Sequence, residues 1–260
     1  MTKNLKTSHF SEIESLAHGR IETLLHALPE TAQQALASAA RITQVARGTC
    51  LISEGDHSTE LSYLLDGALA MEKTLADGRR HIIGVLVPTD MFGRLFNGGC
   101  VYDIVALTDC RILNFERSRF EAILSDFPEL ERIFLVSVLD ELDSAREWVL
   151  LMSARKVSER LASFLLILLR RNLRTTLLKE QRQKHTIVHI PIGRRDLAHH
   201  LGTTPETISR VLTEWEQDGV ILRKDTDEIE VLEPAALVRI SGAEDVDAVV
   251  AAGQQPRFLA

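Results

Sequence analysis

The chain has 260 residues, enough for one large domain or two of ordinary size. Its hydrophobic fraction of 45% and charged fraction of 26% are those of a soluble globular protein. No run of about 18 apolar residues exists that could span a membrane, and the first residues contain no apolar signal core. These features argue against a membrane protein and predict a cytoplasmic one.

The net charge of −7 is unevenly distributed along the sequence. Residues 155–224 carry 14 Lys and Arg against 7 Asp and Glu, whereas the rest of the chain carries 16 basic and 30 acidic residues. A basic segment on an acidic body is expected where one end of a protein binds phosphate. The distribution therefore indicates a nucleic-acid contact in the C-terminal half.

Taken in chain order, residues 1–20 are polar, show no strong period and are expected to be mobile. Residues 21–40 carry Leu and Ala at helical spacing and predict a pair of helices. Between residues 41 and 115 the sequence pattern changes, because glycine recurs and separates short apolar runs. The runs expected to form strands are 50–52, 61–65, 82–87, 104–107 and 112–115.

Two dipeptides between these runs, Asp66-Gly67 and Asp77-Gly78, are strong hairpin-turn signals. Many short strands separated by turns predict a small antiparallel barrel or jelly roll.

This region shows no catalytic constellation: no paired carboxylates, no nucleophile beside a base, no metal-ligand set and no glycine-rich phosphate loop. Cys50, Cys100 and Cys110 are scattered and lack the spacing of a zinc or iron–sulfur site. We therefore expect three small core cysteines, and we expect that the protein is not an enzyme.

Residues 118–126 predict a short helix, and Pro128 then opens a long one. A second apolar stripe on the long helix, made by Ile133, Val136, Leu139 and either Trp148 or Leu150, can pack back on the barrel. One helix with two apolar stripes predicts a dimer, and burial of the helix within a single chain is the alternative. The first stripe is a heptad seam with 3-4-3-4-3 spacing, made by Leu135, Val138, Leu142, Ala145, Val149 and Met152.

Beyond a predicted hinge at residues 153–155, the pattern predicts a helix over 156–172, a polar loop over 174–185 and a short strand over 186–190. A helix over 194–201 follows. Gly202 then stands where a helix end favours a left-handed residue. Residues 203–215 predict a second helix, with Thr204 as its N-cap and Pro205 in its first position. Two apolar runs, 220–223 and 228–232, predict a small hairpin, and the chain from residue 241 onward is expected to be disordered.

The helix over 203–215 has an apolar stripe for a core and a separate polar face, which Glu206, Ser209, Arg210 and Thr213 form. Helix, glycine turn and helix is the helix-turn-helix design, whose second helix reads the DNA major groove. Two amphipathic helices joined by glycine are also common without that function. The short or bidentate side chains of this face favour the DNA reading, because Arg donates to guanine and Glu accepts from a cytosine amino group.

The order of barrel, long helix and winged helix resembles the CRP/FNR family of bacterial transcription regulators. Three local motifs carry the resemblance: VLLMS at 149–153, ERLASF at 159–164 and ETISR at 206–210. It covers about residues 20–240, and the Glu-x-x-Ser-Arg triplet is typical of the FNR-like branch. The resemblance implies an α+β fold, with a mobile N-terminus (1–20), a cyclic-nucleotide-binding-like β-roll (21–127), a dimerisation helix (128–152), a winged helix-turn-helix domain (153–240) and a tail (241–260).

The family resemblance also implies a function for the polar face. Glu206, Ser209 and Arg210 would read an FNR-type palindrome with TTGAT-like half-sites on double-stranded DNA. Further residues would lie at the DNA backbone or on the same face: Thr204, Thr207, Thr213, Arg194 and Arg195. A homodimer of this kind works with RNA polymerase and is expected to activate genes of low-oxygen or nitrogen-oxide respiration.

The sensed signal is less well marked. Residues 1–49 contain no cysteine, which argues against the FNR iron–sulfur cluster. The cAMP-binding relatives keep a Gly-Glu pair and a phosphate-binding Arg, where this chain has Gly93-Arg94 and Tyr102-Asp103, so cAMP is not expected. No cofactor is predicted.

FixK-like regulators, controlled by the amount of protein, and DNR/NnrR-like nitric oxide sensors, which use haem, both stay open. The alternative function is a sensor whose main work is to bind a small molecule in the barrel. An axial haem ligand would come from one of the histidines at 9, 18, 26, 57 and 81, although each is more often a surface residue.

Overall fold

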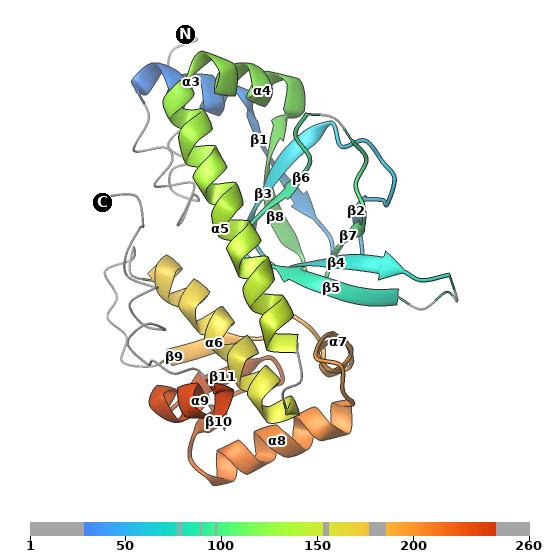
Figure 1. The fold of residues 1–260 in the computed structure, drawn as a ribbon, viewed down its shortest axis with the longest axis vertical. Coiled ribbons are helices and arrows are strands. Elements are labelled where there is room, and N and C mark those ends of the chain that lie inside the picture. Colours follow the sequence, from blue (N-terminus) through green and yellow to red (C-terminus); the bar gives the residue numbers. More distant parts are fainter. Residues whose placement is uncertain are drawn as a thin grey trace. The chain divides into compact units, whose positions relative to one another are not determined.

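The computed structural model describes residues 29–76, 78, 80–88, 90–96, 98–152, 156–176 and 186–242 (Figure 1). The chain divides into two compact units between Asp143 and Ser144, inside the long helix α5 (Pro128–Met152). The predicted mobile N-terminus, the first helix of the predicted pair, the hinge at 153–155 and the tail from 243 lie outside the described residues. In the part of the chain that is described, no helix is long and apolar enough to cross a lipid bilayer.

The first unit contains two four-stranded sheets in which every strand pairing is antiparallel. One sheet has the order β1 (Ala40–Val45), β8 (Cys110–Glu116), β3 (Glu60–Asp66) and β6 (Met91–Gly93). The other has the order β2 (Cys50–Ile52), β7 (Asp103–Ala106), β4 (Leu69–Thr74) and β5 (Arg80–Leu86). The predicted antiparallel β-roll is confirmed.

One hydrophobic cluster joins the two sheets and forms the interior of the β-roll. Its members alternate along the strands, as side chains facing one side of a pleated strand do. The buried residues of this cluster are Leu64, Leu69, Leu86, Phe92, Ile104, Ala106, Cys110 and Ile112.

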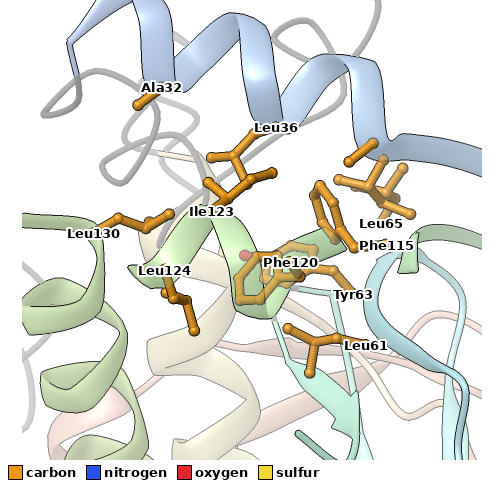
Figure 2. Close-up of a cluster of buried hydrophobic side chains, with 12 residues drawn as sticks. Ala32, Leu36, Leu61, Tyr63, Leu65, Phe115, Phe120, Ile123, Leu124 and Leu130 are labelled. Atoms are coloured by element: carbon orange, nitrogen blue, oxygen red, sulfur yellow. The ribbon is translucent and has the colours of Figure 1, made fainter. Parts of the chain in front are cut away.

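A second cluster covers the other face of the sheet that contains β3 and β8 (Figure 2). Strand residues such as Tyr63 and Phe115 meet side chains from three helices: α3 (Glu30–Ala39), α4 (Arg117–Asp126) and the start of α5. The ring centroid of Phe120 lies 5.3 Å from that of Phe115 and 5.8 Å from that of Phe134. Ile133 packs on the same cluster, so the predicted packing of the second α5 stripe holds at its N-terminal end.

The two turn predictions have opposite outcomes. Asp77-Gly78 joins β4 and β5, which pair as a hairpin, although Asp77 itself lies outside the described residues. Asp66-Gly67 joins β3 and β4, which lie in different sheets, so the prediction of a hairpin there is wrong. The turn is instead a corner between sheets. Gly67 has φ +91°, and a Cβ at this position would fall 2.4 Å from the Asp109 carbonyl oxygen, so the corner requires glycine.

The second unit is a winged helix. Helix α6 (Val157–Thr176) precedes β9 (Thr186–His189), α7 (Arg194–His200) and α8 (Pro205–Gln217). The hairpin of β10 (Ile221–Arg223) and β11 (Glu228–Val231) then pairs with β9 in a three-stranded sheet, which confirms the predicted wing. Helix α6 continues to Thr176, so the loop predicted from residue 174 begins too early. Helix α9 (Pro234–Ser241), absent from the sequence prediction, packs on α6 through its buried Leu237 and Val238.

Candidate nucleic-acid interface

The turn between α7 and α8 is fixed by hydrogen bonds. Gly202 has φ +63°, the left-handed conformation that the sequence predicted. The Thr203 amide donates to the Ala198 carbonyl at 2.8 Å, and Arg160 Nε of α6 donates to the Leu201 carbonyl at 2.9 Å. These bonds satisfy carbonyls that a helix end would otherwise leave open, and they set the direction in which α8 begins.

The start of α8 is the predicted one. Thr204 is the N-cap, its hydroxyl oxygen accepts from the Thr207 amide at 3.3 Å, and Pro205 occupies the first helical turn. The Thr204 and Thr207 hydroxyls lie 3.2 Å apart, so each is close enough to bond the other. Because Pro205 has no amide hydrogen, no backbone donor is left unsatisfied at the first helical position.

The two faces of α8 are separated cleanly. Ile208, Val211, Leu212 and Trp215 are buried in the domain core, as the spacing predicted. Glu206, Ser209 and Arg210 are exposed, whereas Thr207 and Thr213 are half-buried. The Thr213 hydroxyl donates to the Ser209 carbonyl at 2.9 Å and is therefore engaged within the helix.

The exposed side chains of α8 keep their polar groups available. Within the described residues, neither the Ser209 hydroxyl nor the Arg210 guanidinium makes a hydrogen bond or an ion pair. Bonds from its own backbone amide and from the Thr204 hydroxyl lower the pKa of the Glu206 carboxyl. Glu206 is therefore an anionic hydrogen-bond acceptor at neutral pH, beside a cationic donor one helical turn further along.

Arg194 and Arg195 begin α7 and differ in their surroundings. Arg195 is exposed. Arg194 is half-buried, and among the described residues its Nη1 is buried without a hydrogen-bond partner. Burial lowers the pKa of this guanidinium, and the nearby positive charge of Arg223 lowers it further. An anion beside Arg194 would counter both effects and raise this pKa again.

One contact that the sequence did not reveal joins α8 to the wing. Glu216 accepts from Arg223 Nε at 2.9 Å, from the Arg223 amide at 3.1 Å and from Nη2 of the same guanidinium. The guanidinium lowers the pKa of the Glu216 carboxyl. The pair links two elements that are brought together by the tertiary fold, so the spacing along the chain gave no signal for it.

The tip of the wing is acidic. It consists of Asp225, Thr226 and Asp227, all exposed. The carboxylate of Asp225 accepts from the Thr226 amide at 2.6 Å, and Lys224 is paired with buried Glu230 at 2.8 Å. An acidic tip repels phosphate, so we do not expect these three residues to contact the DNA backbone.

The predicted seam of α5 is exposed in the single chain. The exposed fractions are 58% for Leu135, 44% for Val138, 45% for Leu142 and 73% for Val149. Ala145 is exposed as well, and the side chain of Met152 lies outside the described residues. Large apolar side chains in such a row indicate an unfilled contact surface.

The positions compared with the cAMP-binding relatives, Gly93-Arg94 and Tyr102-Asp103, have contacts within the β-roll. Arg94 follows Gly93, and its Nη1 donates to the Gly99 carbonyl at 3.2 Å. Asp103 accepts from the Glu54 amide at 2.7 Å, and Lys73 is paired with the Glu54 carboxylate. Across the described residues, no three His, Cys, Asp or Glu side chains gather as metal ligands do.

The histidines and cysteines of the β-roll are placed as follows. His57 and His81 are exposed, and the other three histidines considered for haem lie outside the described residues. Cys110 is buried, and burial raises the pKa of its thiol. Cys100 is half-buried. Cys50 is exposed, so the prediction that it is a core residue is wrong: it begins the short strand β2, in which Leu51 and Ile52, and not Cys50, pack on the interior cluster.

Comparison with known families matches both units. Residues 159–240 match the Crp-like helix-turn-helix domain, and residues 42–127 match the cyclic nucleotide-binding domain. The transcriptional activator protein FnrL of Cereibacter sphaeroides is 34% identical over 195 residues, which cover 75% of this chain and 78% of FnrL.

Two further relatives agree with this match. The nitrogen fixation regulation protein FixK of Bradyrhizobium diazoefficiens is 32% identical over 181 residues, 70% of this chain and 74% of FixK. Among solved structures, FixK2 from Bradyrhizobium japonicum superposes with a TM-score of 0.69 at 25% identity, covering 79% of this chain and 99% of that chain.

Proposed function

The chain belongs to the CRP/FNR family of transcription regulators, and we propose that it binds a palindromic DNA site as a homodimer with one α8 in each half-site. The family consists of DNA-binding regulators and not of enzymes, and its relatives here are activators of the FNR and FixK type. The observation that carries the proposal is the exposed row of Glu206, Ser209 and Arg210 on a helix whose other side is locked in the core.

The chemistry of the row suits base edges. Arg210 can donate two parallel hydrogen bonds to guanine, and Glu206 can accept from the amino group of cytosine or adenine. Ser209 lies between them and would contact a thymine or a neighbouring edge. This combination fits half-sites of the TTGAT type.

Phosphate contacts would flank the row. Thr204 and Thr207 lie at the N-terminus of α8, where amide hydrogens and the helix dipole favour an anion. Arg195 is exposed at the start of α7, and a phosphate beside Arg194 would supply the partner that its buried Nη1 lacks among the described residues. The basic balance of residues 155–224 supports the same assignment. Thr213 has the weakest case, because its hydroxyl already bonds the Ser209 carbonyl.

The dimer would form along the exposed α5 seam. Burying Leu135, Val138, Leu142 and Val149 against a second copy removes the largest apolar row on this helix from water. A dimer also matches a palindrome, because two recognition helices then meet half-sites about one DNA turn apart.

The resemblance to FnrL and FixK supports activation of genes for low-oxygen or nitrogen-oxide respiration, in concert with RNA polymerase. Such a regulator works in the cytoplasm, where the chromosome is.

Two features speak against cyclic AMP as the ligand: Arg94 stands where cAMP-binding relatives place a ribose-binding carboxylate, and it bonds the Gly99 carbonyl. We propose that the protein binds DNA without a cofactor. An absorption spectrum of the anaerobically purified protein tests this, since a haem band would instead support a nitric oxide sensor.

The central test is a binding titration on a duplex with TTGAT-type half-sites. Arg210→Ala is expected to weaken binding by about 1–3 kcal/mol and to relax the preference at one base pair. Arg239→Ala is the matched control, because Arg239 is an exposed arginine on α9 that no part of the proposed interface uses. Affinity for the natural protein should fall steeply with salt, and a flat salt response would contradict the phosphate contacts.

A further inference from the structure

Two arginines lie near each other at the base of the wing. Strand β11 pairs with β10, which carries Arg223, on one side and with β9 on the other. The Ile190 amide, between β9 and α7, donates to the Asp227 carbonyl at 2.6 Å. The fold therefore holds Arg223 near Arg194 at the start of α7, close enough for its charge to lower the pKa of the Arg194 guanidinium.

Both guanidiniums have N–H donors without an acceptor. Among the described residues, Nη1 of Arg194 is buried without a hydrogen-bond partner. Arg223 donates to the Glu216 carboxylate through Nε and Nη2, and its Nη1 makes no hydrogen bond within the same part of the chain. A guanidinium carries five N–H donors and no acceptor, and a buried donor without an acceptor is costly. The two side chains together therefore lack an acceptor.

The acidic groups of the same unit do not supply that acceptor. The Glu216 carboxylate already receives the side chain and the amide of Arg223. Asp225 and Asp227, at the exposed wing tip, form no ion pair with either arginine among the described residues. Two guanidiniums and one carboxylate leave an excess of positive charge. An oxyanion with several acceptor oxygens, such as phosphate, matches the fork of guanidinium donors.

We propose that Arg223 and Arg194 together bind one phosphate of the DNA backbone, so that the wing contacts DNA through its base and not through its acidic tip. The inference rests on the proposed function and adds Arg223, which the sequence did not mark as a DNA contact. The Arg223 side chain is 34% exposed, so a phosphate can reach it. Its pairing with Glu216 holds the guanidinium in place, which lowers the conformational entropy lost on binding.

A scan of the DNA backbone tests the proposal. On a duplex with TTGAT-type half-sites, replacing one phosphate at a time by an uncharged methylphosphonate should reveal a linkage in each half-site where the natural chain binds about tenfold more weakly. Arg223→Ala should weaken binding to the unmodified duplex about tenfold, lower the salt slope by about one, and reduce the methylphosphonate effect at that linkage alone. Arg239→Ala, the control arginine on α9, should keep the natural profile.

A second variant separates the cation from the link between α8 and the wing. Glu216→Gln removes the charged link but keeps the Arg223 guanidinium, so the methylphosphonate effect at the marked linkage should persist. If Glu216→Gln and Arg223→Ala alter the profile alike, or if Arg223→Ala leaves it unchanged, the assignment of a phosphate to Arg223 is overturned. A natural chain that binds none of these duplexes would overturn the proposed function itself.

Inorganic phosphate has the same chemistry as the DNA backbone, so a measurement without DNA distinguishes the two sources. Phosphate, compared with chloride at equal ionic strength, is expected to change the unfolding temperature of the natural chain and of Arg223→Ala equally. A stabilisation by phosphate that requires Arg223 would identify a free anion as the occupant and overturn the DNA contact.

Discussion

Inside the β-roll, the Ser62 hydroxyl donates to Asn114 Oδ1 at 2.7 Å, and Asn114 Nδ2 donates to the Thr43 hydroxyl at 2.8 Å. On α8, the side chains of Ser209 and Arg210 are exposed and, within the described residues, unpartnered. The β-roll pairs its buried polar groups with one another, because a buried polar group without a hydrogen bond lowers the free energy of unfolding. The winged helix fixes the backbone that carries its polar groups and leaves the groups themselves for a ligand. The buried polar groups of the β-roll thus serve stability, whereas the exposed groups of α8 are the ones proposed for recognition.

The largest effect is expected from truncating a core side chain in each unit. Phe164→Ala in α6 and Leu64→Ala in β3 each remove a side chain that is at most 2% exposed, and each is expected to cost about 3–5 kcal/mol. Phe164→Ala should lower the unfolding temperature of the winged helix and abolish DNA binding at the temperature where that unit melts. Leu64→Ala should lower the transition of the β-roll. Calorimetry checks both, and one shared transition lowered equally by the two variants would show that the units do not unfold separately.

The second test moves from cores to polar groups. Asn114→Ala leaves the Ser62 and Thr43 hydroxyls without a partner and is expected to lower the free energy of unfolding by about 1–3 kcal/mol, with DNA affinity unchanged. Ser209→Ala should do the reverse, because an exposed serine contributes little to stability but would meet a base edge. Denaturant unfolding and DNA titration of both variants check the pair. Equal stability losses in the two would contradict the contrast.

The sequence predicted the winged helix better than the β-roll, and the reason is physical. The turn and helix of residues 202–217 are encoded locally, by Gly202, Thr204, Pro205 and a stripe of apolar residues at helical spacing. The β-roll depends on pairings between distant segments. Asp66-Gly67 has the composition of a hairpin turn, but β3 pairs with β8 and β6 and not with β4, which no local pattern records.

The candidate site shows the same division. The outward positions of Glu206, Ser209 and Arg210 followed from the helical period and are confirmed as exposed. The partial burial of Arg194, its closeness to Arg223 and the pairing of Arg223 with Glu216 did not follow. They depend on how the wing folds back on α7 and α8. Strands β1, β4 and β6 and helix α9 were missed for a related reason, since each is held in place by elements distant in the sequence.

A smaller effect is expected at the N-cap of α8. Thr204→Ala removes the hydroxyl that accepts from the Thr207 amide and should cost about 1 kcal/mol of stability. If Thr204 also holds a phosphate, DNA affinity should fall uniformly across sequences. Thr203→Ala is the matched control, because Thr203 contributes its backbone amide to the turn and keeps that bond. Thermal unfolding and titration on matched and mismatched duplexes separate the two roles.

The smallest effect concerns the link between α8 and the wing, and it depends on pH. The Arg223 guanidinium lowers the pKa of Glu216 below its ordinary value of 4.5, so the folded state favours the ionised carboxyl. The stabilisation is complete above about pH 4.5 and is lost as pH falls through the lowered folded-state pKa. Glu216→Gln should therefore lower the unfolding temperature at pH 7 slightly, and the difference should vanish in acid.

Glu214→Gln is the control for this last prediction, because Glu214 is an exposed glutamate on the same helix. If Glu216→Gln and Glu214→Gln lower the unfolding temperature alike at pH 7 and at pH 3, the Arg223 pair does not stabilise the wing. If the Glu216 difference disappears in acid and DNA affinity at pH 7 falls with it, the pair is a tether. It then holds α8 at a fixed angle to the wing, so that a contact near the end of the helix orients the exposed row of Glu206, Ser209 and Arg210.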